Sequence, residues 1–137
     1  MIKYDSESLA LMSFFEKLTK SNLKDMFDMG EILVFVVEPF QLRKALGENA
    51  QNVQKLKERL KKKIKMVEYN ADLATFIRSL IYPLRVNNFR FEEGIVTLEG
   101  EDTKTNGLLI GRGAANLRAY EVAVQRYFKD VKEIKVV

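Results

Sequence analysis

Cysteine and histidine are both absent from the 137-residue sequence. Without cysteine the chain has no disulfide framework and no thiolate site, and without histidine it lacks the commonest metal ligand and general base. The lack of cysteine fits a reducing, intracellular setting. No apolar run approaches the roughly 20 residues that span a bilayer, and the N-terminal segment shows no small-residue cleavage pattern. We therefore expect a cytoplasmic protein with no membrane partner.

Apolar residues and positive charge are both well represented. A hydrophobic content of 47% is enough to bury the core of one ordinary domain or of two small ones. Lysine and arginine number 23 against 19 aspartates and glutamates, which gives a net charge of +4 and a pI near 9.2. This balance favours an anionic partner.

The second half of the sequence repeats the first without a gap. Gly47 recurs as Gly111, 64 positions later, and Ala50 recurs as Ala114 at the same offset. Further pairs at this offset are Gly30 and Gly94, Asn52 and Asn116, Phe27 and Phe91, Ile32 and Val96, Val34 and Leu98, Leu46 and Ile110, and Val53 and Leu117. The repeat predicts two copies of one folding unit, with a glycine-led loop at the same place in each copy.

Each copy is expected to begin with a helix and a pair of strands. The apolar positions of the helix follow Asp5 in the first copy and lie between Asp72 and Pro83 in the second. They are Leu11, Phe15 and Leu18, and then Leu73, Phe76, Ile77, Leu80 and Ile81. The strand pairs are "LKDMFDMG" with "EILVFVV" and "VNNFRFEEG" with "IVTLEG". Since "ILVFVV" has no polar alternation, we expect that strand to be buried on both faces.

A short helix, the glycine-led loop, a long helix and a last strand complete each copy. The short helices are "QLRKALG" and roughly "TNGLLIG", and the last strands are "IKMVEY" and "EIKVV". The expected apolar faces of the long helices are Val53, Leu56, Leu60 and Ile64, and Leu117, Tyr120, Val124 and Phe128. The element order of both copies is therefore α-β-β-α-α-β.

The second loop, Gly111-Arg112-Gly113-Ala114, has the chemistry of a phosphate site. Glycine allows a partner to approach the main chain closely, and a helix start leaves amide N–H groups without internal acceptors. A tight turn that happens to carry an arginine is the alternative for one isolated loop. Its recurrence at equivalent places in two copies favours the first interpretation.

This element order, with a glycine-led loop before the long helix, resembles the type II K-homology (KH) domain of prokaryotic RNA-binding proteins. The pair resembles the archaeal NusA family over nearly the whole chain, including "LRKALGENAQNVQKLKERLKKKIKMVEYNADLATFIRSLIYP" and "LLIGRGAANLRAY". The resemblance implies an α+β fold of two tandem KH domains, 1–70 and 71–137, each with a three-stranded mixed sheet. It implies single-stranded RNA as a partner, RNA polymerase or other transcription proteins as further partners, and a role in termination, antitermination or pausing without a cofactor.

The KH resemblance also implies which residues contact RNA. In KH domains the loop clamps the backbone of about four nucleotides while the bases lie over an apolar groove. The residues that match in the second copy are Gly111, Arg112, Gly113, Ala114, Asn116 and Arg118, with Leu109 and Ile110 as either groove floor or core. Those in the first copy are Gly47, Asn49 and Ala50, with Arg43, Lys44 and Lys55 nearby.

The first loop departs from the family pattern. Glu48 stands where the family typically has lysine or arginine, and the loop has one glycine where the family usually has two. A carboxylate repels phosphate by on the order of 1 kcal/mol at an exposed site, so we expect a weakened clamp. Asn49 tolerates left-handed geometry, so the loop shape is expected to survive.

The basic segment "KLKERLKKKIK" downstream is interpreted mainly as a solvated helix face, some of whose lysines lie near the RNA. Phe27, Phe35, Phe89 and Phe91 are expected in the core rather than stacked on bases.

Two other classes of function compete with this interpretation. A dinucleotide-binding enzyme is disfavoured because Asn116 replaces the third glycine of the fingerprint and no GK[ST] loop occurs. We therefore expect no enzyme and no small-molecule substrate. A KH-type protein-interaction module, or an RNA-binding factor in ribosome assembly or RNA decay, stays open as an alternative.

Overall fold

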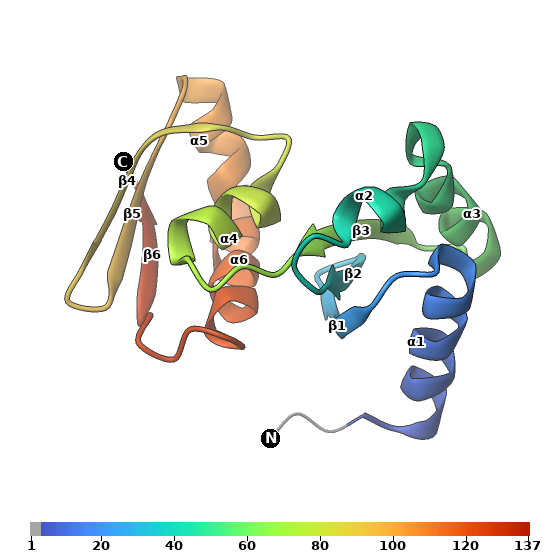
Figure 1. Cartoon of the computed structure of the whole chain (residues 1–137). Helices are drawn as coiled ribbons and strands as arrows, with labels where there is room; N and C mark the ends of the chain where they lie inside the picture. Colours follow the sequence, from blue (N-terminus) through green and yellow to red (C-terminus); the bar gives the residue numbers. More distant parts are fainter. Residues whose placement is uncertain (1–3) are drawn as a thin grey trace. The chain divides into compact units, whose positions relative to one another are not determined.

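The computed structural model of the chain describes residues 4–137 and divides between Asn70 and Ala71 into two compact units (Figure 1). The first unit contains α1 (Ser6–Thr19), β1 (Leu23–Met29), β2 (Ile32–Val37), α2 (Leu42–Leu46), α3 (Gln51–Leu60) and β3 (Lys63–Glu68). The second contains α4 (Leu73–Ile81), β4 (Val86–Glu92), β5 (Ile95–Gly100), α5 (Thr103–Ile110), α6 (Ala115–Gln125) and β6 (Glu133–Val136). The predicted order α-β-β-α-α-β is confirmed in both.

Each unit has one three-stranded sheet. The strand order is β1-β2-β3 in the first sheet and β4-β5-β6 in the second. The first two strands of each sheet pair antiparallel as a hairpin, and the third pairs parallel with the central strand. Since both directions occur in each sheet, the sheets are mixed and the predicted α+β class is confirmed.

Aspartate side chains fix where three helices begin. The carboxylate of Asp5 accepts a hydrogen bond from Ser8 N at 2.7 Å, which confirms the predicted start of α1. Asp72 caps α4 in the same way. The segment "TNGLLIG" underestimated α5, because Asp102 accepts from Thr105 N at 2.7 Å and thereby starts the helix at Thr103.

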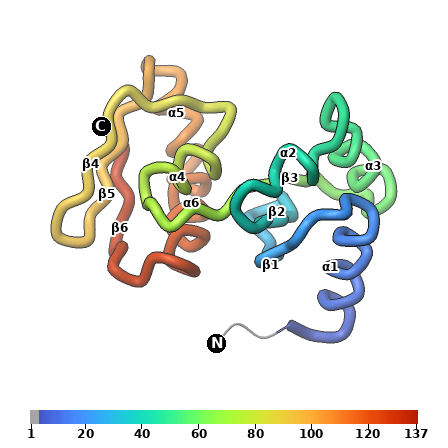
Figure 2. The backbone as a smooth tube through the Cα atoms, viewed as in Figure 1, coloured from blue at the N-terminus to red at the C-terminus, as the bar shows by residue number. Residues whose placement is uncertain are grey.

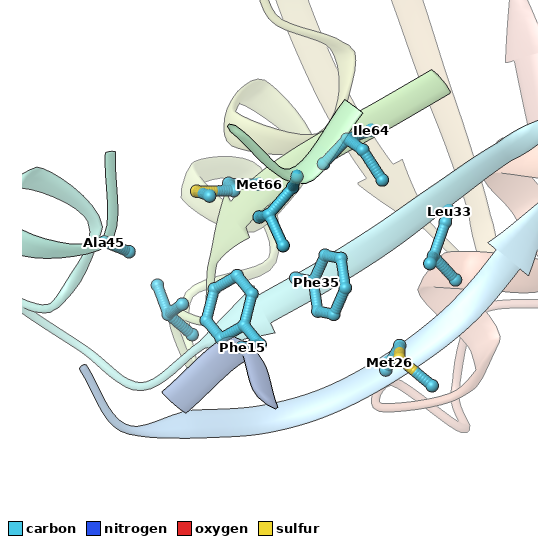
Figure 3. Packing of buried hydrophobic residues seen from close by; sticks show 9 residues of the cluster. Phe15, Met26, Leu33, Phe35, Ala45, Ile64 and Met66 are labelled. Carbon is cyan, nitrogen blue, oxygen red and sulfur yellow. The ribbon is translucent and has the colours of Figure 1, made fainter. Parts of the chain in front are cut away.

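The core of the first unit lies between its helices and one face of its sheet. Phe15 of α1 stacks on Phe35 of β2 with ring centroids 4.4 Å apart (Figure 3). Ala45 of α2 and Leu56 of α3 belong to the same cluster. Every residue of β2 from Leu33 to Val37 is buried, so the prediction of a strand buried on both faces is confirmed.

Two residues expected on the long helices lie beyond them. α3 ends at Leu60, where Lys61 takes a left-handed conformation (φ 57°), so Ile64 belongs to β3 and reaches the core from the sheet. α6 ends at Gln125, and Phe128 packs against Phe76 from the following turn at a centroid distance of 5.6 Å. The spacing of the apolar residues correctly predicted both helices. It did not predict where they end, because neither end is marked by a glycine or a proline.

Candidate nucleic-acid interface

The two glycine-led loops have the same backbone conformation. We call residues 47–50 the first loop, which joins α2 to α3 (Figure 2), and residues 111–114 the second loop, which joins α5 to α6. The leading glycines have φ/ψ of 75°/−177° and 74°/175°. The third positions have φ of 54° and 61°, and the fourth 55° and 63°. The first loop has therefore kept its shape with a single glycine, as predicted.

Gly111 and Asn116 hold the second loop closed. The φ/ψ of Gly111 lies in a region that is essentially restricted to glycine. A Cβ at this position would lie 2.7 Å from the Asn116 amide nitrogen, so the absent side chain leaves room for Asn116. The Asn116 Nδ2 in turn donates to the carbonyl of Leu108 at 2.9 Å, in the last turn of α5.

Gly47 and Asn52 repeat this arrangement in the first loop. A Cβ on Gly47 would approach Asn52 Nδ2 to 2.8 Å, and that nitrogen donates to the carbonyl of Ala45 at 2.9 Å. The sequence interpretation assigned Asn116 to RNA and missed this role in closing the loop. The recurrence of asparagine at the same offset as the glycines was the signal that could have revealed it.

The second loop presents donors to solvent. Ala114 N donates back to Gly111 O at 3.3 Å, and Ala115 N donates to Arg112 O. Within residues 4–137 the N–H groups of Arg112 and Gly113 donate to no backbone carbonyl. Successive free N–H groups in a turn form a concave anion site, and the exposed Arg112 guanidinium lies on the same turn.

Some of the other predicted RNA-contacting side chains of the second unit are exposed and unpaired within residues 4–137, whereas others are buried or already bonded within the protein. Arg112 has no ion-pair partner in the described part of the chain. Arg118 Nη1 lies 2.8 Å from Glu121 Oε2, so its charge is partly neutralised. Leu109 is fully buried, which favours the core over the groove floor, the two alternatives that the sequence left open for it. Ile110 is half-buried, while Leu108, which the sequence reasoning missed, is 46% exposed.

The first loop carries an acid among cations. Glu48 is exposed on the loop, Arg43 and Lys44 are exposed on α2, and Lys55 is exposed on α3. Across the described residues none of these four side chains forms an ion pair. The positive charge of this unit therefore lies on the helices beside its loop rather than at the loop's second position.

The basic segment after the first loop is only partly helical. Because α3 ends at Leu60, Lys63 and Lys65 lie in β3. Lys62 and Lys63 lie 3.9 Å from Asp28 and Glu31, contacts between exposed groups that contribute little. Lys65 is half-buried, and burial lowers its pKa to about 8.

The phenylalanines expected in the core do not all lie there. Phe35 is fully buried, and Phe27 and Phe89 are half-buried. Phe91 is 39% exposed and lines a surface pocket of about 410 Å³ in the second unit, so its assignment to the core was wrong. The most exposed aromatic residue in the described chain is Phe40, which the sequence reasoning did not single out.

Within residues 4–137 no three acidic, histidine or cysteine side chains cluster as metal ligands. None of the helices between residues 4 and 137 combines the length and the hydrophobicity that a membrane span requires.

Two copies of one α+β unit, each with a glycine-led loop at the start of a helix, define a duplicated protein with one cationic and one acidic loop. No family model matches the sequence. Curated relatives do match along nearly its whole length, and the chain belongs to the archaeal NusA family.

Two of these relatives are named probable transcription termination protein NusA. The one from Methanococcus vannielii is 31% identical over 99% of this chain and 80% of its own length. The one from Thermoplasma acidophilum is 28% identical over 98% of this chain and 95% of its own length. The crystal structure of APE1850 has a TM-score of 0.74 at 23% identity, covers 98% of this chain and 100% of its own, and so shows the same fold.

Proposed function

We propose that both units are type II KH domains, that the protein binds single-stranded RNA mainly through the second loop, and that it acts in transcription termination, antitermination or pausing. The names of the relatives support the transcriptional role. The observation that carries the RNA site is Arg112, an exposed cation without an ion pair in the described chain. Two N–H groups of the same loop, those of Arg112 and Gly113, donate to no backbone carbonyl of residues 4–137 just before α6.

The chemistry of this loop matches a phosphodiester. Gly113 has open space around it, because a Cβ there would meet nothing within 4 Å. A phosphate can therefore approach the main chain, accept from the free N–H groups and pair with the Arg112 guanidinium. In KH domains the bases lie over an apolar groove and must be unpaired to do so, so we expect single strands to be preferred to duplexes.

The test is a binding titration with random-sequence single-stranded RNA, duplex RNA and single-stranded DNA at several salt concentrations. We expect the tightest binding to single-stranded RNA. Arg112→Glu should weaken it about 10-fold and reduce the salt slope by ~0.7, because one phosphate is no longer neutralised. Arg90→Glu, at an exposed arginine of β4, makes the same charge change away from the loop and is the matched control. Equal reductions of affinity in both variants would show that general positive charge, not the loop, binds the RNA.

The transcriptional role needs its own measurement. Adding the protein to archaeal RNA polymerase transcribing in vitro should change the yield of paused or terminated RNA, and Arg112→Glu should reduce that change. Glu48 supports one alternative, in which the first unit binds a protein rather than RNA. That alternative replaces ours if no single-stranded RNA binds and transcription is still affected.

A further inference from the structure

Phe40 combines two unfavourable features. Its side chain is 94% exposed, so it leaves nearly all of its apolar surface in water. Its backbone is in the left-handed region, with φ of 67°, which is rare for a bulky residue. Strain of this kind persists only where the surroundings fix it, and it is concentrated at functional sites.

A turn fixes Phe40 in this conformation. Gln41 N donates to Glu38 O at 3.1 Å, which makes Phe40 the third residue of a four-residue turn with Pro39 before it. Positive φ at this position is the requirement of a type II turn and is usually met by glycine. The turn is anchored on both sides, because Glu38 N donates to Asn22 O at 2.9 Å and Asn22 N donates to the Gln41 side chain at 3.1 Å.

Cations lie one helical turn further along. Arg43 and Lys44 follow Phe40 by three and four positions, both are exposed, and neither has an ion-pair partner in the part of the chain described. They lie on α2, which leads into the first loop. The exposed ring and two free cations thus precede a loop that has no cation of its own.

We propose that Phe40 is a base-stacking platform for single-stranded RNA in the first unit, with Arg43 and Lys44 contacting the flanking phosphates. The inference rests on the proposed RNA-binding function. A protein partner would need a contiguous apolar patch, whereas the residues around Phe40 in sequence are mostly polar or charged. One flat ring beside phosphate-binding cations is what a nucleotide needs, since stacking is tolerant of base identity.

A tryptophan in place of Phe40 reports stacking directly. The chain has no tryptophan, so Phe40→Trp creates a single fluorophore. Adding a random-sequence single-stranded RNA of about 12 nucleotides, within the range that single-strand binding sites cover, should quench its emission, with affinity equal to that of the unaltered protein. The matched control is Leu9→Trp on α1, which is also exposed (53%) but follows Asp5 and Glu7. Unquenched emission from the Phe40→Trp variant when RNA is bound would overturn the proposal.

Truncation separates the ring from its surroundings. Phe40→Ala and Phe40→Leu should each weaken RNA binding roughly 10-fold while leaving the salt slope unchanged, because every phosphate keeps its cation. Phe40→Gly should weaken RNA binding by the same factor. It should also raise the midpoint of urea unfolding, because glycine relieves the backbone strain, and this higher midpoint would show that the fold of the variant is intact. Unchanged affinity in all three variants would overturn the platform alone. If the unaltered protein binds no single-stranded RNA, the proposed function itself is what fails.

Discussion

The first and second loops have the same backbone and opposite charge. Their leading glycines have nearly equal φ (75° and 74°), yet the next residue is Glu48 in one and Arg112 in the other. Shape and charge are therefore set by different positions. The glycine and the asparagine that follows the loop fix the shape, and the second position is free to carry either sign.

The comparison also shows which positions of the loop must be glycine for the backbone to adopt this shape. The third position is Asn49 in one loop and Gly113 in the other, and both are left-handed. The fourth position is alanine in both, at φ of 55° and 63°. Only the leading glycine occupies a region closed to other residues, so the loop shape does not depend on a glycine at the position of Gly113.

The largest expected effect comes from removing a leading glycine. Gly111→Ala and Gly47→Ala should each destabilise their unit by about 2–4 kcal/mol, because the new Cβ meets asparagine and the backbone is strained. Urea unfolding followed by NMR signals of each unit measures the two destabilisations separately.

The control for this substitution is Gly113→Asn, which copies the first loop into the second. It should change stability by less than about 0.5 kcal/mol, because Asn49 already adopts this conformation. A large destabilisation here would mean that the two loops are held in different ways.

The next effect separates the two asparagines. Asn52 is buried and Asn116 exposed, although each donates to a carbonyl of the preceding helix at 2.9 Å. Asn52→Ala leaves a buried acceptor unpaired and should cost about 1–3 kcal/mol, whereas Asn116→Ala should cost about 0.5–1 kcal/mol because water replaces it. Equal destabilisation by thermal or urea unfolding would contradict this ranking.

A charge exchange between the loops tests whether charge alone separates their affinities. Glu48→Arg should strengthen RNA binding about 5-fold, equivalent to roughly 1 kcal/mol at an exposed site. The double variant Glu48→Arg with Arg112→Glu should recover part of the affinity that Arg112→Glu removes. If it recovers none, the first loop lies outside the RNA path even though its backbone is the same.

The smallest expected effect is a change in how the stability of the second unit depends on acid pH. Hydrogen bonds from Thr75 and Thr105 lower the pKa of the capping carboxyls Asp72 and Asp102 in the second unit. A lowered folded-state pKa adds stability above the unfolded pKa, and this stability is lost as pH falls through the folded value. Asp102→Asn keeps a capping group that does not titrate. It should flatten the decline of the second unit's stability between about pH 5 and 3, measured by NMR-detected unfolding.

Much of the fold could be predicted because each sequence pattern occurs in both copies of the repeat. The caps Asp5 and Asp72, the doubly buried β2 and the α-β-β-α-α-β order all follow from local sequence and were found in the structure. The retained shape of the first loop followed from a single residue, Asn49, whose tolerance of left-handed geometry is intrinsic.

What could not be predicted depends on tertiary surroundings. Leu108 and Leu109 are identical residues next to each other, and only packing decides that one is exposed and the other buried. The conformation of Phe40 depends on the hydrogen bond from Gln41 N to Glu38 O and on the hydrogen bonds between this turn and Asn22, which no local pattern reveals. Asn116 likewise resembles a ligand-contacting residue until its partner on α5 is known.

Each loop lies inside the connection between the two parallel strands of its sheet, since residues 47–50 separate β2 from β3 and residues 111–114 separate β5 from β6. A parallel pair forms only after the chain has traversed its crossover. Closing the loop and adding the last strand are therefore coupled, and we expect a partner bound at the loop to stabilise the pairing of that strand as well. If RNA binds at a loop, the amide protons of the strand that follows it, β3 or β6, should exchange with solvent more slowly while the RNA is bound.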